Sequence, residues 1–480
     1  MVLGPVLFSI GTLAALRRLQ QSFPAAEFTA YLDDVTVAAP PGILRQACDA
    51  TARAMLALGI ETNEDKTEVL STKGPVDMAV QPLPFARVLG AGIANEPESP
   101  LITEYVQRKT EETNRLFRAI VELPFAKCTQ WRLLAVSALP RLTFLLRTHD
   151  PRHTRDAAEW FDVRVTGVLS TLIDGPVTKR ARDIAALPVR RGGCGLRRQR
   201  DIAEFAYACL GEKGKQRALT AELEDERQRD LFNNLQGPDR KVFVANTAPG
   251  AGRPLTDPQV HADDRGFATY LRERMLLRVL PEGQQCVCGA DASNDHVHTC
   301  SRLHQNPRTT RHDMINMAFA NGLRLCGFQC GLEPRLTEVS RRRPDILVVG
   351  LDTYAVTDVT VTYPGRVTTP KAEETLEDCD PMRAARERLT QKRQKYRHWA
   401  LGNGLDFEPF VMLTNGAIHP TSRWWLRRVL GNQDHRLTIT TAYDFIIAET
   451  LTALLRGNVS VFNAASGRGT PGGGPGQARP

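Results

Sequence analysis

This sequence lacks several features that mark membrane-spanning, secreted or repeat proteins. The apolar stretch from Val2 to Leu19 is interrupted by glycines and a proline and carries two arginines near its end, so it is too short and too broken to cross a bilayer. No secretory signal and no internal repeat are found. Cysteines number only 10 in 480 residues, and several stand alone in apolar or helical contexts: Cys48, Cys128, Cys194 and Cys209. We therefore expect an intracellular protein with reduced thiols.

The composition is that of an ordinary globular chain with clustered positive charge. A length of 480 residues allows about two to four domains, and 42% hydrophobic with 24% charged residues predicts real buried cores. The formal net charge is only +8, but eight Lys or Arg and a single acid, Asp183, lie between Lys179 and Arg200. Two further basic clusters span 341–343 and 383–397. Solvated helix faces would explain any one cluster, whereas three clusters, two of them beside candidate catalytic residues, favour binding to nucleic acid.

The first hundred residues predict a small α/β sheet. Two β-type runs at 28–31 and 35–37 flank the turn that holds Asp33 and Asp34, which predicts a hairpin with acids at its tip. An amphipathic helix over 43–58, ended by a glycine, and a short strand follow the hairpin. Strand, helix and strand in this order indicate a palm-like sheet. A further helix is expected ahead of the hairpin, over 6–20, with an apolar face made by Leu7, Ile10, Leu13, Ala14 and Leu16.

The remaining chain alternates between helical and mixed segments. Residues 104–209 are expected to be mainly helical, with a break at a glycine-rich turn over 192–196. Gly, Pro, Asn and Asp are frequent in 236–257, which we interpret as a linker or long loop. Residues 310–460 alternate helix and strand signals, as expected for an α/β domain. The Gly/Pro-rich tail over 465–480 is expected to be disordered.

Asp33 and Asp34 are neighbouring carboxylates in a strand turn flanked by Leu32 and Val35. Such carboxylates repel each other, and with no Lys or Arg beside them a divalent metal is an attractive partner. Nucleotidyl transfer commonly uses two metals, one to activate the attacking oxygen and one to steady the leaving group. An exposed turn is the plain alternative, because an aromatic-x-Asp-Asp tetrapeptide alone is weak evidence.

The surroundings of this hairpin resemble the reverse transcriptases of non-LTR retrotransposons. Leu3-Gly4-Pro5-Val6-Leu7-Phe8 resembles the block before the active-site hairpin, and Tyr31-Leu32-Asp33-Asp34 resembles the hairpin itself. Asn63-Glu64-Asp65-Lys66-Thr67 looks like the next block, and Leu89-Gly90 looks like the strand after it. The segment 187–196 is similar to one found beyond the thumb in these enzymes. The resemblance implies catalytic, metal-binding roles for the two aspartates of the hairpin.

The same resemblance implies an incomplete polymerase. Family members carry another metal-binding aspartate on an earlier strand and fingers that hold the template and the nucleotide, and neither is expected in a sequence that starts at Met1. We therefore expect that this chain does not polymerise, either because it is a fragment of a longer reading frame or because it is a decayed copy.

Three cysteines and a histidine between Cys286 and Cys300 predict a zinc site. Zinc takes four tetrahedral nitrogen or sulfur ligands from a short closed loop, and Gly289 permits the tight turn. Since four protein ligands leave no position for water, the site is expected to be structural. The alternatives are His298 as the histidine ligand, and a loop with three free thiols. Site-specific non-LTR elements carry a similar Cys-Cys-His-Cys group just before their nuclease, and the matching residues here are Cys286, Cys288, His296 and Cys300.

Two further carboxylates predict a magnesium site later in the chain. Asp345 opens a β-type run over 346–349, and Asp358 lies inside a second apolar run over 355–361. Carboxylates on neighbouring strands can converge on one Mg²⁺. An unpaired charge at Asp358 would be costly in so apolar a strand, which argues for a metal or for a salt bridge to the arginines of 341–343.

These elements resemble the PD-(D/E)xK nuclease core. The position that usually holds its lysine is Thr360 here, whereas the restriction-like endonucleases of non-LTR elements take a lysine from the next helix, in a Lys-x-x-Lys-Tyr pattern. Lys392 and Lys395 match that pattern together with Tyr396. Because the two lysines lie one helical turn apart, both are candidates for the catalytic residue.

Further residues are expected to complete the site and to bind nucleic acid. Arg311-His312-Asp313 resembles the family's motif after the zinc segment, and Glu333 is a candidate for completing the metal shell. The implied mechanism is hydrolysis of a DNA phosphodiester, with Mg²⁺ held by the two aspartates and with Lys392 or Lys395 orienting the attacking water or steadying the transition state. The implied partners are DNA and RNA without a membrane, in the nucleus. The candidate contacts to nucleic acid are Arg190, Arg191, Arg311, His312, Arg342 and Arg343.

The resemblance implies a multidomain chain of mixed α/β and α class. Its expected function is a metal-dependent DNA endonuclease joined to a truncated reverse transcriptase, nicking the target for target-primed reverse transcription. A catalytically inactive nucleic-acid-binding remnant is the alternative, and Mg²⁺-dependent nicking separates the two. The expected parts are a partial reverse-transcriptase palm over 1–100, a helical thumb and post-thumb region over 101–235, a linker over 236–280, a zinc-binding segment over 281–310, a restriction-like endonuclease domain over 311–464 and a disordered tail over 465–480.

Overall fold

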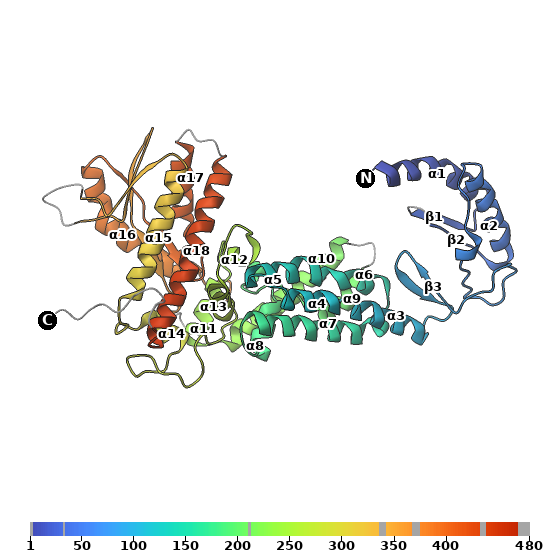
Figure 1. Cartoon of the computed structure of the whole chain (residues 1–480), viewed down its shortest axis with the longest axis horizontal. Helices are drawn as coiled ribbons and strands as arrows, with labels where there is room; N and C mark the ends of the chain where they lie inside the picture. The colour runs from blue at the N-terminus through green and yellow to red at the C-terminus, as the bar shows by residue number, and fades with distance from the viewer. Residues whose placement is uncertain are drawn as a thin grey trace. The chain divides into compact units, whose positions relative to one another are not determined.

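The computed structural model describes residues 3–31, 34–209, 213–335, 342–366, 375–432 and 438–468 (Figure 1). Asp33, Arg341 and most of the predicted tail lie outside these ranges. The chain divides into two compact units. The first unit comprises Met1–Asn114, Arg141–Phe161 and Ala203–Lys213, and the second unit comprises Arg115–Pro140, Asp162–Ile202 and Gly214–Pro480.

The first unit begins with a helix, a hairpin and a second helix. These elements are α1 (Leu3–Ser22), β1 (Glu27–Tyr31), β2 (Asp34–Ala38) and α2 (Pro41–Leu56). The two strands pair antiparallel with Tyr31 opposite Asp34, so Asp34 lies at the tip of the hairpin as predicted. The amphipathic pattern of α2 is also confirmed, because its inner face buries Leu44, Ala47, Thr51 and Met55.

The apolar face predicted for α1 is not the one that the unit buries. Leu7, Ile10 and Leu13 are exposed, whereas Ala15 and Leu19 are buried. The helix contacts β1 and α2. Because apolar residues are spread around most of α1, their spacing does not determine which side meets these two elements.

A second hairpin follows a short 3-10 turn at Glu64–Lys66. Strands β3 (Phe85–Val88) and β4 (Ala91–Ala94) pair antiparallel, and Leu89 and Gly90 make the turn between them with positive φ angles of 51° and 85°. In the described residues this hairpin and β1–β2 form separate two-stranded sheets. A continuous palm-like sheet therefore remains a prediction. The helices after this hairpin are α3 (Pro100–Glu111), α6 (Thr143–Thr148), α7 (Pro151–Leu172) and α9 (Gln199–Ala208), the last two shared between the units.

The first part of the second unit is helical, as predicted for 104–209. Buried side chains such as Trp131, Leu169 and Ile184 form its core. Gly192 and Gly195 adopt positive φ angles of 85° and 79°, which explains the glycine-rich break. Its elements are α4 (Asn114–Glu122), α5 (Lys127–Leu133), the helical turns Leu134–Ala138, Leu139–Leu142 and Val189–Arg191, α8 (Lys179–Ala186) and α10 (Lys213–Asn234).

The segment expected to be a linker or long loop, 236–257, forms helices instead. Helix α11 (Gly237–Ala245) has a proline in its first turn and buries Val242, Phe243 and Val244. Helices α12 (Arg253–Thr256) and α13 (Asp264–Arg274) follow, and α13 is buried along most of its length. The Gly and Pro residues start and end short helices here, so a high content of turn residues did not mean an open loop.

The last part of the second unit is an α/β layer, as predicted for 310–460. Four strands form a sheet in the order β5-β6-β7-β9, while β8 pairs in parallel with β10. Helices α15 and α18 pack side by side (Figure 1). The elements are α14 (Asn294–Thr299), α15 (Pro307–Leu325), β5 (Gln329–Leu332), β6 (Ile346–Gly350), β7 (Thr353–Thr357), β8 (Val359–Thr362), the 3-10 turn Pro364–Arg366, α16 (Arg383–Gly402), β9 (Asp406–Phe407), β10 (Phe410–Leu413), α17 (Pro420–Gly431) and α18 (Ile439–Ala465).

Helix α18 is long and apolar enough to cross a membrane by length and composition alone. Its most apolar window has a mean hydropathy of 1.3, but 72% of that window is buried inside the second unit. The helix contacts α13, α14, α15 and α17. Its apolar side chains thus form the core of this unit, which accounts for the composition without a bilayer.

Candidate catalytic and metal-binding sites

Asp345 lies directly before β6 and meets two other elements. Its Oδ2 accepts a hydrogen bond from the backbone N–H of Val359 at 2.7 Å and lies 3.0 Å from Nε2 of His312 on α15. The Asp345 side chain is 14% exposed. The carboxylate is therefore held in place by groups from β8 and α15 at an edge that solvent still reaches.

Asp358 lies at a break between two strands, and not inside one strand as predicted. β7 ends at Thr357 and pairs with β6 and β9, whereas β8 begins at Val359 and pairs with β10. The carbonyl of Asp358 accepts a hydrogen bond from the N–H of Phe410 at 3.0 Å. The apolar run is continuous in sequence, but the chain changes partner strands in its middle, which brings the carboxylate to the junction.

The carboxylate of Asp358 is paired with Lys392 of α16. Nζ of Lys392 lies 2.5 Å from Oδ1, and the hydroxyl of Thr360 donates to the same oxygen at 3.3 Å. Burial raises the pKa of Asp358, and the charge of Asp345 adds to this effect while Lys392 opposes it. The salt bridge foreseen as an alternative therefore forms, with a lysine of the predicted pair as the partner in place of the arginines.

The two candidate lysines differ in their surroundings. Lys392 contacts the acid, whereas Lys395 is exposed and its Nζ lies 4.5 Å from the centroid of the Tyr396 ring. Tyr396 is buried, and its hydroxyl donates to the carbonyl of Arg343 at 3.1 Å. Of the two lysines, Lys392 is thus the one that contacts a candidate acid.

His312, a predicted contact to nucleic acid, lies beside Asp345. The hydrogen bond to Asp345 raises the pKa of His312 to about 9, so the imidazole is cationic at neutral pH. Glu333 contributes through its backbone, because its N–H donates to the carbonyl of Asp345 at 2.8 Å, while the residue itself is exposed. The sequence motif identified His312 as a candidate residue. Its pairing with Asp345, 33 residues later, could not be predicted from the spacing.

Two carboxylates with these partners form a candidate site for a hard divalent cation. Carboxylate oxygens are the donors that Mg²⁺ prefers. Among the described residues, the ligand atoms of Asp345, Asp358 and a third acid, histidine or cysteine do not all lie within 4.8 Å of one another. The cysteine-histidine cluster is the one group there that meets this condition. The acids are instead neutralised by His312 and Lys392, and a divalent ion would take over that role.

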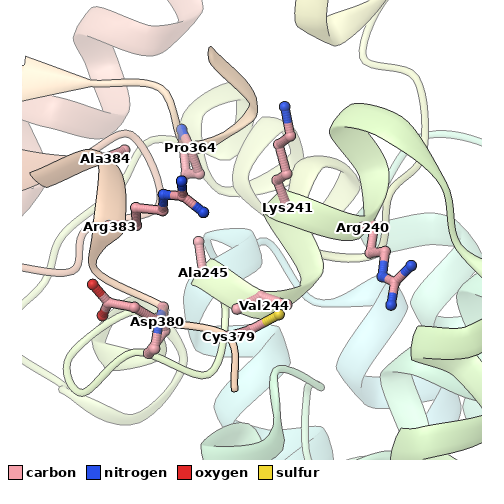
Figure 2. Close-up of a pocket in the computed structure, with 10 residues that line it drawn as sticks. Arg240, Lys241, Val244, Ala245, Pro364, Cys379, Asp380, Arg383 and Ala384 are labelled. Atoms are coloured by element: carbon pink, nitrogen blue, oxygen red, sulfur yellow. The ribbon is translucent and has the colours of Figure 1, made fainter. Parts of the chain in front are cut away.

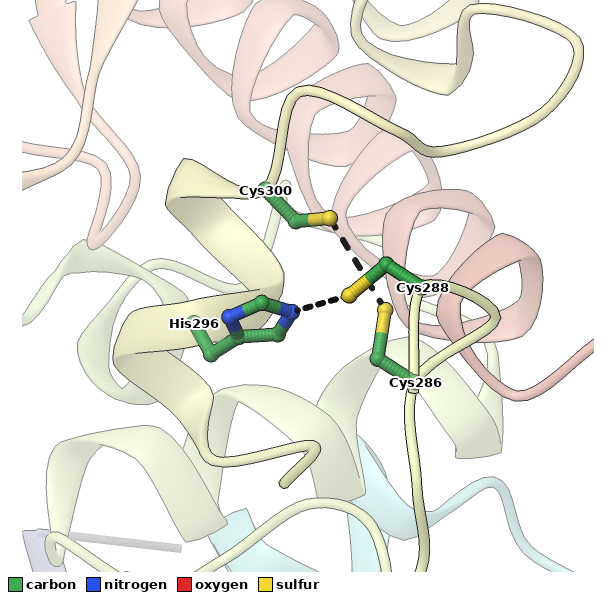
Figure 3. A group of neighbouring side chains, drawn as sticks. All are labelled: Cys286, Cys288, His296 and Cys300. Atoms are coloured by element: carbon green, nitrogen blue, oxygen red, sulfur yellow. Dashed lines mark hydrogen bonds between the residues drawn. The ribbon is translucent and has the colours of Figure 1, made fainter. Parts of the chain in front are cut away.

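Cys286, Cys288, His296 and Cys300 converge as the spacing predicted (Figure 3). Their ligand atoms all lie within 4.8 Å of one another, so the group could hold a metal such as zinc. Sγ of Cys286 lies 3.9 Å from Sγ of Cys300, and Sγ of Cys288 lies 3.1 Å from Nε2 of His296. A hydrogen bond from the backbone of Ala290 lowers the pKa of the Cys288 thiol to about 7, which favours the thiolate form.

His298, the rival zinc ligand, points elsewhere. Its Nε2 lies 2.6 Å from Oε1 of Glu273, and its ring stacks on Tyr363 at 4.5 Å between centroids. The side chain is only 1% exposed. His298 therefore anchors the segment to the core, and His296 is the histidine of the candidate metal group.

Several arginines predicted to bind nucleic acid are engaged within the protein. Arg191 pairs with Glu224 and Asp225 of α10, and its side chain is 13% exposed. Arg311 is buried, donates to Oδ1 of Asn458 at 3.0 Å, and has its pKa lowered to about 10 by burial. By contrast, Arg190, Arg342 and Arg343 are exposed. The engaged and the exposed arginines differ in their burial. The clustering of basic residues in the sequence does not predict that difference.

A separate pocket lies between α11 and the start of α16 (Figure 2). The basic side chains of Arg240, Lys241 and Arg383 line it together with Val244 and other apolar groups. None of the candidate catalytic residues lines this pocket. The acids described above therefore lie outside it.

Comparison with known proteins agrees with the motifs. The chain is 59% identical over 472 residues to the "Retrotransposable element SLACS 132 kDa protein" of Trypanosoma brucei gambiense. The match covers 98% of this chain and 40% of that protein, so the chain spans less than half the length of this relative. No protein-family model matches the chain. This similarity supports the resemblance to a non-LTR retrotransposon protein that the sequence motifs indicated.

Proposed function

We propose that this chain is part of a non-LTR retrotransposon protein and that it cleaves DNA in a reaction that requires Mg²⁺. The observation that carries the proposal is two neighbouring acid–base pairs, His312–Asp345 and Lys392–Asp358, joined at the strand junction where Asp345 accepts a hydrogen bond from the N–H of Val359. These residues come from α15, the start of β6, the β7–β8 junction and α16. Two acid–base pairs drawn from four elements, with perturbed pKa values and at an edge that solvent reaches, have the features common at functional sites.

Each residue has a definite role in the proposed reaction. Asp345 and Asp358 would hold Mg²⁺, which would supply Lewis-acid activation of the phosphoryl oxygen and of the attacking water. Lys392 stands close enough to Asp358 to orient that water or to stabilise charge on the phosphorane. His312 fixes the orientation of Asp345 and supplies positive charge beside the phosphate.

The proposed partners are DNA and RNA. Nicking would expose a 3′-hydroxyl for target-primed reverse transcription by a complete polymerase. Asp33 and Asp34 match acids of such a polymerase, whereas this chain alone is not expected to polymerise. Of these two acids, Asp34 lies in the described hairpin. We also propose that the group around Cys286 binds zinc as a structural metal, because four protein ligands leave no position for a reacting water.

Plasmid nicking tests the proposal. The purified chain is incubated with supercoiled DNA in Mg²⁺, and conversion to the open circle is followed over time. Asp345→Ala should slow nicking by roughly 100-fold or more, because the cation loses a ligand. Asp352→Ala is the matched control, since Asp352 is an exposed acid in the turn after β6 and its hydrogen bond to Asn432 is made by its backbone carbonyl.

The control variant should nick at the wild-type rate. Nicking by Asp345→Ala at that rate would refute the assignment of the acids. Salt-sensitive DNA binding without any nicking, in the wild-type chain, would favour the inactive nucleic-acid-binding remnant.

A further inference from the structure

Helix α17 presents an unusual pair of neighbouring tryptophans. Trp425 is fully buried with 0% exposure, whereas Trp424 is 61% exposed. The buried face of α17 also holds Leu426, Val429 and Leu430. The core thus explains Trp425 and leaves Trp424 as a large aromatic ring open to solvent, able to stack on a ligand.

An arginine lies over one face of this aromatic ring, which leaves the opposite face for a ligand. Arg428 lies one turn after Trp424, and its guanidinium carbon is 5.1 Å from the centroid of the indole ring. The same guanidinium forms an ion pair with Asp406 of β9. Because Arg428 is held from both sides, the indole has a fixed neighbour, and less side-chain entropy is lost when a ligand stacks on it.

The rest of the outer face of α17 is positively charged. The helix carries Arg423, Arg427 and Arg428 and no acid. Arg427 is exposed, and its guanidinium carbon lies 4.3 Å from the centroid of the Tyr443 ring on α18. Of the three arginines, Arg428 has an acid partner in Asp406. The face therefore combines one open aromatic ring with a surplus of positive charge.

We propose that this face of α17 binds single-stranded nucleic acid, with an unpaired base stacked on Trp424 and the backbone phosphates near the exposed Arg427. Stacking on aromatic rings beside a basic surface is how proteins bind unpaired strands without reading their sequence. An indole flanked by a guanidinium suits the face of a base, whereas a duplex keeps its base faces covered. The site is separate from the proposed nuclease acids and does not depend on their activity.

Binding of labelled oligonucleotides tests the site. Fluorescence anisotropy is measured with single-stranded DNA, single-stranded RNA and duplex DNA, without added Mg²⁺ so that cleavage plays no part. Trp424→Ala should weaken single-strand binding by about 5- to 150-fold, the loss expected for one stacked base, and should change duplex binding much less. Trp424→Phe should retain most of the affinity because it keeps an aromatic face. The DNA and RNA arms show which strand the site prefers.

Tyr354→Ala provides the matched control. Tyr354 is an exposed aromatic residue of β7, 52% exposed, outside the proposed face. It should leave single-strand binding unchanged, and circular dichroism should show that all variants are folded. Unchanged single-strand affinity in Trp424→Ala would overturn the proposal. A change of self-association in that variant, seen by sedimentation without a loss of oligonucleotide affinity, would also overturn it and identify a protein interface.

Discussion

Nζ of Lys392 lies 2.5 Å from Oδ1 of Asp358, so a lysine from α16 neutralises the acid at the break between β7 and β8. The Asp358 side chain is only 3% exposed, while that of Lys392 is 27% exposed. An acid so deeply buried depends on its partner, because an uncompensated charge away from water is costly. Once Asp358 is charged and buried, the fold therefore depends on Lys392, separately from the role of the lysine in the proposed chemistry.

Replacing the lysine should separate these contributions. Lys392→Met leaves Asp358 buried without its partner, so the free energy of unfolding should fall by roughly 2–4 kcal/mol, and nicking should be lost. Lys395→Met should change that free energy by about 0.5 kcal/mol or less, since Lys395 is exposed over Tyr396. Urea denaturation of both variants measures the difference. Equal losses would show that the ion pair does not set the stability of this junction.

The metal group predicts a specific pattern of zinc content. Cys300→Ser should reduce bound zinc from about one ion per chain toward none and lower the melting temperature, because one of four closely spaced ligands is lost. His298→Gln should retain the zinc, since His298 is bonded to Glu273 and lies outside the group. Atomic absorption of the purified variants gives the stoichiometry. Zinc retained by Cys300→Ser, or lost from His298→Gln, would require a different ligand set.

Local sequence patterns predicted much of this structure. Short sequence spacings, which depend on local geometry, predicted three features. These are the hairpin with Asp34 at its tip, the buried face of α2 and the convergence of the Cys286 group. The buried side of α1 and the helices over 236–257 did not, because they depend on which surfaces meet in the folded chain. The pairing of His312 with Asp345 is also a product of tertiary structure.

Asp162 predicts a pH dependence of stability in the second unit. It accepts hydrogen bonds from the backbone N–H groups of Gln199 and Arg200, at 2.8 and 3.2 Å, and burial raises its pKa to about 6. A carboxyl with a raised pKa binds its proton more tightly in the folded state. Its contribution to stability is therefore complete below about pH 4 and is lost as the pH rises through about 6.

Asp162→Asn should remove this part of the pH dependence. Urea unfolding of the wild type and the variant is compared between about pH 4 and 7, and the difference between the two free energies should change in this range and level off above it. Asp156→Asn, on the same helix, serves as the control for an added amide. A constant difference between wild type and Asp162→Asn across the range would show that Asp162 titrates normally.

The two classes of arginine predict opposite effects of substitution. Arg311 is buried and bonded to Asn458, so Arg311→Met should lower the free energy of unfolding by about 1–3 kcal/mol while leaving the salt dependence of DNA binding unchanged. Arg342 and Arg343 are exposed beside Asp345 in sequence. The double variant Arg342→Gln/Arg343→Gln should change stability by less than about 0.5 kcal/mol and reduce the slope of log affinity against log salt by about 1–2, as expected for lost phosphate contacts. Affinity titrations at several salt concentrations measure that slope, and a slope altered by Arg311→Met but not by the double variant would reverse the assignment of these residues.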